Sequence, residues 1–322
     1  MEPMSKKAGG NTGSRRGHVK YAGIADRTIA RYKKQVRNFF AFLHVHDGSF
    51  PHTMDELDTA AGDYVNHLYQ EGEPYGYATD FVSGLRRLYP RCRRHLGTAQ
   101  QYCKFWGKGI RRRRALPLPA DVLVGMVGVA FAYGDEKGAV TMLIGFLGLL
   151  RTEEMLSLRR RQLRFIQDKL VVISLPGSKG SQRKGYDECV LIHDPMAIRL
   201  LLRVVQGLGG EERVFDGSLR DLGARIKRYA EAFGVSDPSL TPYCLRRGGA
   251  TWHFARYASL DATQALGRWE HASTAKIYIN QALSDSTALS LSGRAAARLE
   301  RCKRVLARLA ALPLPPPPLP PR

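Results

Sequence analysis

The chain has 322 residues, of which 44% are hydrophobic, and this length suffices for two domains with separate cores. Its 50 Lys and Arg residues outnumber its 29 Asp and Glu residues, which gives a formal net charge of +21. This charge favours a polyanion such as nucleic acid as partner. A basic protein of another kind, for instance a ribosome-associated factor, can have the same excess of positive charge. The sequence has no run of about 18 apolar residues, which argues against a membrane span, and its five cysteines form no CxxC pair, which argues against a zinc site or a disulfide framework.

The first part of the chain predicts a basic arm followed by helices. Residues 1–20 combine Lys and Arg with Gly, Ser and Asn, so we expect a disordered arm. Thr53 and Glu56 form the pattern of a capping box, which predicts a helix from there to Gly72. With further helices near 78–88 and 98–106, we expect a small all-helical domain over 21–108. Its first helix begins at Asp26 and is expected to bury a stripe consisting of Ile29, Tyr32, Val36, Phe39 and Leu43.

A strongly basic stretch occupies the later half of this domain. Between Arg86 and Arg114 the sequence has eleven Lys or Arg residues and no Asp or Glu, and aromatic residues lie among them. Contact with the DNA backbone requires a basic face of this kind. The predicted DNA-binding residues are Arg86, Arg87, Arg91, Arg93, Arg94, Lys104, Arg111, Arg112, Arg113 and Arg114.

A linker and a second domain follow. The arginine run at 111–114 and the prolines after it interrupt helix and strand patterns, so we place the linker at 109–118. The second domain, 119–311, is expected to be mostly helical with one small three-stranded antiparallel sheet, which makes the whole fold mainly α in the α+β class. Its expected elements are helices on both sides of Gly134, strands at 162–166, 169–175 and 187–192, helices at 195–206, 218–233 and 242–256, and two short helices that end at Gly267 and at Tyr278.

Three short motifs in the second domain carry chemically active side chains. Arg151 precedes Glu154 by about one helical turn, in the segment LLRTEE. Tyr243 and Arg246 are three residues apart, so a helix would place them on one face. Tyr278 follows Trp269 by nine residues, and Trp269 ends the segment LGRW. Two guanidiniums can stabilise the charge of a pentavalent phosphate that a tyrosine hydroxyl attacks, so this set fits phosphodiester chemistry.

The three motifs resemble those of the tyrosine recombinase and phage integrase family. The C-terminal signature of that family reads roughly His-x-x-Arg, then Leu-Gly-His/Trp, and then the nucleophilic Tyr. The sequence differs from the signature at Tyr243, where His or Lys is usual, and by Arg268 between Gly267 and Trp269. The second difference resembles members of the family from eukaryotic mobile elements.

The resemblance implies a site-specific recombinase that integrates or excises DNA through a 3′-phosphotyrosine intermediate, without metal, ATP or another cofactor. It implies double-stranded DNA as partner, a core-binding domain followed by a catalytic domain, and a homotetramer on DNA. The expected location is inside the cell, in a eukaryotic nucleus or a bacterial nucleoid. The implied catalytic residues are Arg151, Lys179, Tyr243, Arg246, Trp269 and Tyr278, with Glu154 in support and Lys184 as the alternative general acid to Lys179.

Several alternatives stay open at this point. A DNA-binding relic of a mobile element would keep the fold without catalysis, as Tyr243 favours, and a type IB topoisomerase would share the chemistry but act as a monomer. An apolar stripe from Leu291 to Leu309 predicts a terminal helix, which either docks on a neighbouring protomer or packs on its own domain. The Pro-rich tail at 312–322 fits either an SH3- or WW-type ligand or a disordered end.

Overall fold

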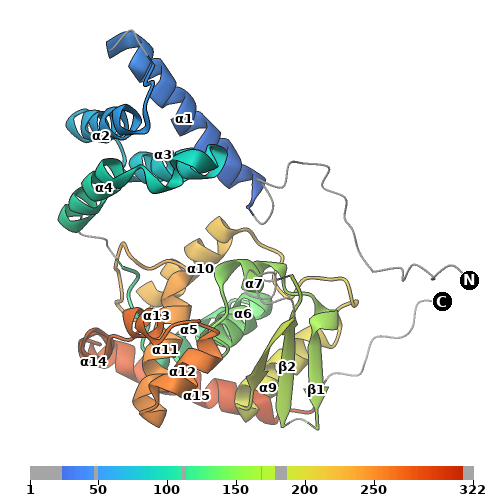
Figure 1. Ribbon diagram of the computed structural model, residues 1–322. Coiled ribbons are helices and arrows are strands. Elements are labelled where there is room, and N and C mark those ends of the chain that lie inside the picture. Colours follow the sequence, from blue (N-terminus) through green and yellow to red (C-terminus); the bar gives the residue numbers. More distant parts are fainter. Residues whose placement is uncertain (1–23, 47–49, 111–113, 168, 178–186, 315–322) are drawn as a thin grey trace, which may run out of the picture. The chain divides into compact units, whose positions relative to one another are not determined.

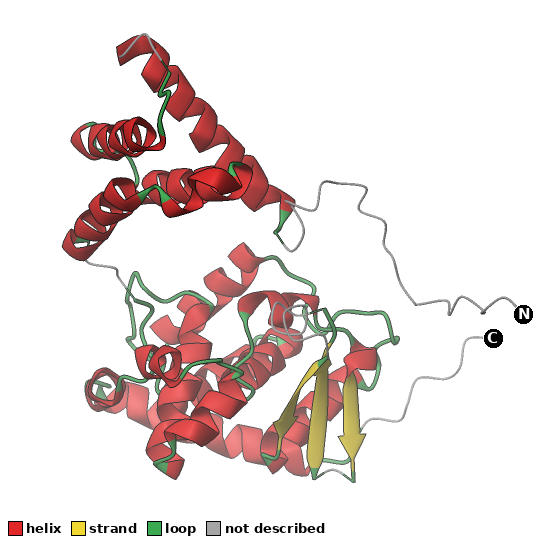
Figure 2. Ribbon diagram, in the orientation of Figure 1, coloured by secondary structure: helices red, strands yellow, loops and turns green. Residues whose placement is uncertain are grey.

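The computed structural model describes residues 24–46, 50–110, 114–167, 169–177 and 187–314. The chain divides into two compact units, Met1–Arg112 and Arg113–Arg322 (Figure 1). The described residues are mostly helical, and three strands form one antiparallel sheet at an edge of the second unit (Figure 2). This composition confirms the predicted fold class. None of the described helices is long and apolar enough to cross a membrane.

The first unit is built from two helix pairs. Helix α1 packs against α3, and α2 packs against α4. The rings of Phe39, Tyr64 and Phe81 meet at the centre, where Phe81 lies 4.8 Å from Phe39 and 4.9 Å from Tyr64 between ring centroids. Val36, Phe39 and Leu43 of the predicted stripe are buried. The elements are α1 (Asp26–His46), α2 (Met54–Gln70), α3 (Tyr75–Leu88), the 3₁₀ helix η2 (Pro90–Arg94) and α4 (Gly97–Gly109).

Side chains from neighbouring segments cap two of these helices. Thr53 Oγ1 accepts a hydrogen bond from Glu56 N at 3.2 Å, as the capping-box pattern predicts. Glu56 Oε2, however, accepts from His52 N at 2.8 Å, one residue before the expected position. The N-terminus of α4 is capped from α2, because the carboxylate of Asp58 accepts from Thr98 N at 2.9 Å and from Ala99 N at 3.2 Å. This contact fixes α4, on which part of the predicted DNA-binding stretch lies.

The second unit surrounds a helical core. Helix α6 packs against α5, α9 and α11, and the sheet, in the order β1-β2-β3, lies against α9 through β2. Phe165 pairs with Val171, and Ile173 pairs with Val190. The sequence did not predict α7 or α14. The elements are α5 (Ala120–Ala132), α6 (Glu136–Leu147), α7 (Thr152–Ser157), the 3₁₀ helix η3 (Arg160–Gln162), β1 (Leu163–Ile166), β2 (Leu170–Leu175), β3 (Glu188–Ile192), α9 (Pro195–Val205), α10 (Leu219–Glu231), α11 (Tyr243–Tyr257), α12 (Leu260–Gly267), α13 (Ala272–Tyr278), α14 (Gln281–Leu289) and α15 (Gly293–Ala311).

The terminal helix α15 packs on its own unit, against α5 and α9 (Figure 1). Ala295, Leu299 and Leu306 of its predicted apolar stripe are buried there. Arg199 of α9 donates from Nε to the carbonyl of Ala310 at 3.1 Å, close to the end of the helix. Of the two placements considered for this helix, the structure therefore shows the one within the chain.

Helix α11 lies close to its neighbours at two consecutive glycines. A Cβ at Gly248 would overlap the backbone of Leu118, and a Cβ at Gly249 would overlap the carbonyl of Phe146 at the end of α6. Both residues are fully enclosed by the core. This close approach brings the first turns of α11 against the end of α6 and the connection between α6 and α7.

We expect Gly249→Ala to lower the free energy of unfolding by about 1–3 kcal/mol, because the added methyl group overlaps backbone that cannot rotate away. Urea unfolding of the full chain measures this difference. Gly293→Ala is the matched control, since a Cβ there, at the exposed start of α15, meets no atom within 4 Å. Equal unfolding midpoints for the two variants would contradict the close approach.

Candidate active site

The buried guanidinium of Arg246 forms the centre of the site. Helix α11 begins at Tyr243, so Arg246 lies in its first turn, where only 2% of the residue is exposed. Nη1 donates to the carbonyl of Leu149, and Nη2 donates to the carbonyl of Gly267 at 2.6 Å. Two backbone oxygens from different segments thus hold the side chain. Burial, followed by the positive charges of Arg268 and Arg151, lowers the pKa of Arg246 below its ordinary value.

Aromatic rings enclose this guanidinium. Its Cζ atom lies 4.6 Å from the ring centroid of Trp269 and 5.5 Å from that of Tyr278. The Trp269 and Tyr278 rings are 4.4 Å apart and tilted by 42°. Tyr243 and Tyr278 share a hydrogen bond between their hydroxyls. The structure therefore brings Tyr243, Arg246, Trp269 and Tyr278 together, although they come from two helices, α11 and α13, and from the connection between α12 and α13.

The backbone of Tyr278 is also tied to α11. Its carbonyl accepts hydrogen bonds from Arg247 Nε at 3.4 Å and from Thr251 Oγ1 at 3.3 Å. Arg247 Nη1 in turn donates to Ala115 O at 2.6 Å. Thr251 Oγ1 also accepts from Asn280 N at 3.1 Å, just beyond α13. These contacts hold the end of α13, and thereby the Tyr278 hydroxyl, close to Arg246; nothing in the sequence indicated the role of Thr251.

Arg151 lies beside two buried carboxylates. Its Nη1 donates to Glu154 Oε1 at 2.6 Å and to Glu188 Oε2 at 3.3 Å. The side chain of Arg151 is 28% exposed, whereas those of Glu154 and Glu188 are 7% and 3% exposed. Burial opposes the charged form of Arg151, but the two carboxylates outweigh it, and its pKa is raised. Glu154 and Glu188 thus both form ion pairs with Arg151, and the sequence did not indicate Glu188.

Arg268 completes this ionic cluster. It joins α12 to Trp269 with φ at +56°, and its side chain is 6% exposed. Nη2 donates to Glu154 Oε2 at 2.6 Å, and Nε lies 3.5 Å from Glu188 Oε2. In the sequence, Arg268 was notable only because it stands between Gly267 and Trp269. Three guanidiniums, those of Arg151, Arg246 and Arg268, therefore lie near two carboxylates, and the cluster has one net positive charge.

Other predicted site residues lie elsewhere or outside the described part of the chain. Lys179, Lys184 and the run at 111–113 are outside it, so the structure does not place them. Arg91, Arg93, Arg94, Lys104 and Arg114 are exposed, as a DNA-contacting role requires. Arg86 and Arg87 are partly buried, and Arg86 Nη1 donates to Gln100 Oε1 at 3.4 Å. Among the described residues, no group of three His, Cys, Asp or Glu side chains is placed to hold a metal ion.

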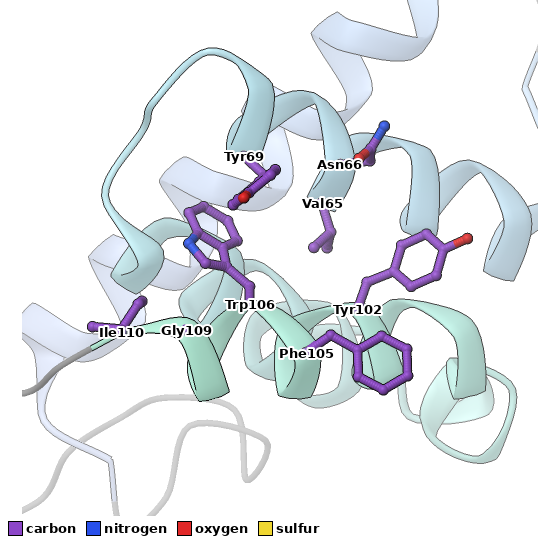
Figure 3. A pocket seen from close by; sticks show the side chains of 8 residues that line it. All are labelled: Val65, Asn66, Tyr69, Tyr102, Phe105, Trp106, Gly109 and Ile110. Atoms are coloured by element: carbon purple, nitrogen blue, oxygen red, sulfur yellow. The ribbon is translucent and has the colours of Figure 1, made fainter.

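Three aromatic residues of the basic stretch, Tyr102, Phe105 and Trp106, line a hollow in the first unit (Figure 3). This hollow, of about 460 Å³, is lined by α2, α4 and the residue after α4. Trp106 lies edge-on to Tyr69, with ring centroids 5.4 Å apart, while Tyr102 and Phe105 are 41% and 55% exposed. Lys108 Nζ lies 5.8 Å from the Phe105 ring centroid. The aromatic part of the predicted DNA-binding stretch is therefore concave and has a cation beside it.

The chain is similar in fold to known DNA recombinases. No protein-family model and no curated protein sequence matches it. The XerH site-specific recombinase bound to a palindromic difH substrate, in a post-cleavage complex, is 14% identical with a TM-score of 0.56, and 81% of this chain and 78% of that one are covered. The Tn1549 transposon integrase in complex with circular intermediate DNA is 14% identical with a TM-score of 0.56, and the match covers 85% of this chain and 99% of that chain. A lambda integrase dimer bound to a COC′ core site is 15% identical with a TM-score of 0.52, and the match covers 80% of this chain and 73% of that chain. At such identities the similarity shows a shared fold, that of tyrosine recombinases and integrases.

Proposed function

We propose that the chain is a site-specific DNA recombinase that cleaves and rejoins DNA strands through a 3′-phosphotyrosine intermediate. One observation carries the proposal: the Tyr278 hydroxyl lies at a site where the Arg246 guanidinium is fixed by backbone carbonyls and by two aromatic rings. The fold shared with XerH recombinase and Tn1549 integrase, both solved with DNA, supports it.

In the proposed reaction, the Tyr278 oxygen attacks the scissile phosphorus, and its phenolic proton passes to solvent water. The bond from phosphorus to the 5′ oxygen breaks, and a proton from Lys179 goes to that oxygen, so a 5′-hydroxyl leaves. The guanidiniums of Arg246 and Arg151 stabilise the charge that develops on the pentavalent phosphate. The phosphodiester energy is kept in the tyrosine ester, so a second strand can reverse the step without ATP or a metal ion.

The exposed cations of the helical unit would contact the DNA backbone. We assign a core-binding role to 21–108 and a catalytic role to 119–311, joined by a linker at 109–118. The net charge of +21 supports double-stranded DNA as partner, because contacts to phosphate release counterions. A homotetramer on DNA, with an origin in a mobile element, completes the proposal, and salt-dependent DNA affinity tests the electrostatic part.

A second candidate is a DNA-binding protein of this fold that has lost catalysis. Tyr243 favours it, because a phenol stands there and shares its hydrogen bond with Tyr278. Burial, together with that hydrogen bond, raises the pKa of Tyr243 well above the ordinary value, so the side chain stays neutral. A neutral phenol can donate one hydrogen bond but adds no positive charge at the phosphate.

A DNA suicide substrate separates the two candidates. A nick next to the cut removes the strand end needed for rejoining, so the covalent complex accumulates and is seen on a denaturing gel. The DNA should come from the ends of the element encoding the protein or from a selected random pool. We expect the complex to form in EDTA without nucleotide. Salt-sensitive DNA binding without any covalent complex would favour the silent protein, and topology changes independent of protein concentration would favour a monomeric topoisomerase.

The role of Tyr243 can be tested by two substitutions. We expect Tyr243→Phe to slow single-turnover cleavage on the order of a hundredfold, because one hydrogen-bond donor at the site is lost. In Tyr243→His, the imidazole gains positive charge as pH falls through about 6.5, so its cleavage rate should rise over that range relative to wild type. Tyr257→Phe, on an exposed part of the same helix, is the control. Equal rates for wild type and Tyr243→Phe would show that this hydroxyl has no part in cleavage.

A further inference from the structure

Arg268 occupies a backbone position that favours glycine. Its φ of +56° lies in the left-handed region, which residues with a side chain adopt rarely. It forms the left-handed C-cap of α12, and its backbone N–H donates to the carbonyls of Ala265 and Gln264. An arginine at such a position needs a reason beyond the turn itself, and the contacts of its guanidinium provide one.

Arg268 and Arg151 bind the same two carboxylates. Glu154 Oε1 accepts from Arg151, while Glu154 Oε2 accepts from Arg268 at 2.6 Å. Glu188 Oε2 lies 3.3 Å from Arg151 Nη1 and 3.5 Å from Arg268 Nε. The exposures differ, however: the Arg268 side chain is 6% exposed and that of Arg151 is 28% exposed. The inner arginine is thus enclosed with the carboxylates, and the outer one reaches the surface.

A second contact links Arg268 to Arg246. Arg246 Nη1 donates to the carbonyl of Leu149, and Arg268 Nη2 lies 3.5 Å from the same oxygen. Arg268 Nη1 donates to the preceding carbonyl, that of Gly148, at 3.3 Å. Leu149 itself has φ at +46°, so this turn is held in an unfavourable conformation next to both arginines. Arg268 therefore contacts the segment that positions Arg246 as well as the carboxylates that bind Arg151.

We propose that Arg268 is a positioning residue that neutralises one of the two negative charges of Glu154 and Glu188 from inside, so that Arg151 remains available to a phosphate. The inference rests on the proposed function. Two carboxylates next to Arg151 alone would carry a net charge of −1, and they would hold its guanidinium and cancel its charge. With Arg268 present, the two carboxylates and the guanidiniums of Arg151 and Arg268 are neutral together, and Arg246 adds one positive charge to the site. The carboxylates thus orient Arg151 without leaving excess negative charge beside it.

The matched pair Arg268→Gln and Arg268→Lys tests this role. Both variants keep a side chain at the left-handed position, so the positive φ has the same conformational free-energy cost in both. Only lysine keeps the positive charge. On the suicide substrate we expect single-turnover cleavage to fall on the order of a hundredfold in Arg268→Gln and by less than about tenfold in Arg268→Lys. DNA affinity should stay at the wild-type value in both. Arg304→Gln, an exposed charge loss on α15, is the control.

A compensating substitution separates positioning from simple loss of structure. In Arg268→Gln/Glu188→Gln the charges balance again, so cleavage should recover to within about tenfold of wild type. Thermal unfolding of each full-length variant shows that the compared proteins are folded.

Labelling of Arg151 gives a readout that does not depend on cleavage. Phenylglyoxal modifies accessible arginines, and the modified peptide is quantified by mass spectrometry. We expect Arg151 to react more slowly in Arg268→Gln than in wild type, since two carboxylates then hold it, and to regain its reactivity in the double variant. Unchanged Arg151 labelling, or equal loss of cleavage in the Lys and Gln variants with no recovery in the double variant, would overturn the proposal. Loss of the covalent complex in wild type itself would instead refute the proposed function, with the labelling result still deciding the role of Arg268.

Discussion

Replacement of Tyr278 by Phe is expected to abolish covalent attachment to DNA and to leave DNA affinity unchanged. The substitution removes only the hydroxyl, so the ring can keep its contact with Trp269, whose centroid lies 4.4 Å away. Because the covalent step cannot proceed without its nucleophile, we expect the cleavage rate to fall by at least about 10⁴-fold. A denaturing gel of the suicide substrate, with binding measured separately, gives both quantities.

Because the hydroxyls of Tyr243 and Tyr278 share a hydrogen bond, the result for Tyr278→Phe must be compared with that for Tyr243→Phe. Either hydroxyl lies near Arg246, so the two phenylalanine variants must be assayed side by side. Tyr278→Phe should eliminate the covalent complex, whereas Tyr243→Phe should only slow its formation. If Tyr243→Phe eliminated the complex and Tyr278→Phe retained it, the nucleophile would be the tyrosine of α11.

The second large effect is expected for Arg246→Lys. An ammonium group cannot reach both the Leu149 and Gly267 carbonyls and also cover two aromatic rings, as the planar guanidinium does. We expect single-turnover cleavage to fall about 10²–10³-fold, because a fixed cation at the phosphate is displaced. A carbonyl left without its donor should also reduce the free energy of unfolding by about 1–3 kcal/mol.

Arg256→Lys is the control for this substitution. Arg256 is an exposed residue of the same helix and also lies over a ring, with its Cζ 5.7 Å from the Trp252 centroid. It should unfold and cleave as wild type does. Urea unfolding and single-turnover cleavage of both variants separate loss of structure from loss of chemistry. Wild-type cleavage by Arg246→Lys would mean that the guanidinium is structural only.

Most of the fold could be predicted because the long helices show clear periodicity. The apolar stripes of α1 and α15 recur at helical intervals, and the β-branched residues of β1 and β2 flank a short turn. Helix α7 spans only six residues, Thr152–Ser157, which is too short to show a period. The cap that Asp58 provides to α4 joins residues 40 apart in sequence, and a single sequence does not reveal such a pairing.

The candidate site likewise contains some residues that the sequence predicted and others that it did not. Motif spacing predicted that Tyr278, Trp269 and Arg246 belong to one site, and the structure places them in contact. The contribution of Glu188 depends on a contact with Arg151 across 37 residues, and that of Arg268 on a contact with Glu154 across 114 residues. Neither residue stands in a pattern with its partner. Their roles follow from burial and charge balance, which only the folded chain shows.

The most direct test of the proposed function is to identify the residue and the DNA end in the covalent complex. The complex trapped on the suicide substrate is digested with protease and nuclease, and the remaining nucleotide–peptide adduct is sequenced by mass spectrometry. We predict one adduct, on the peptide that contains Tyr278, joined to a 3′ phosphate, with a free 5′-hydroxyl on the released strand. An adduct on another residue, or a link to a 5′ phosphate, would contradict the proposed mechanism.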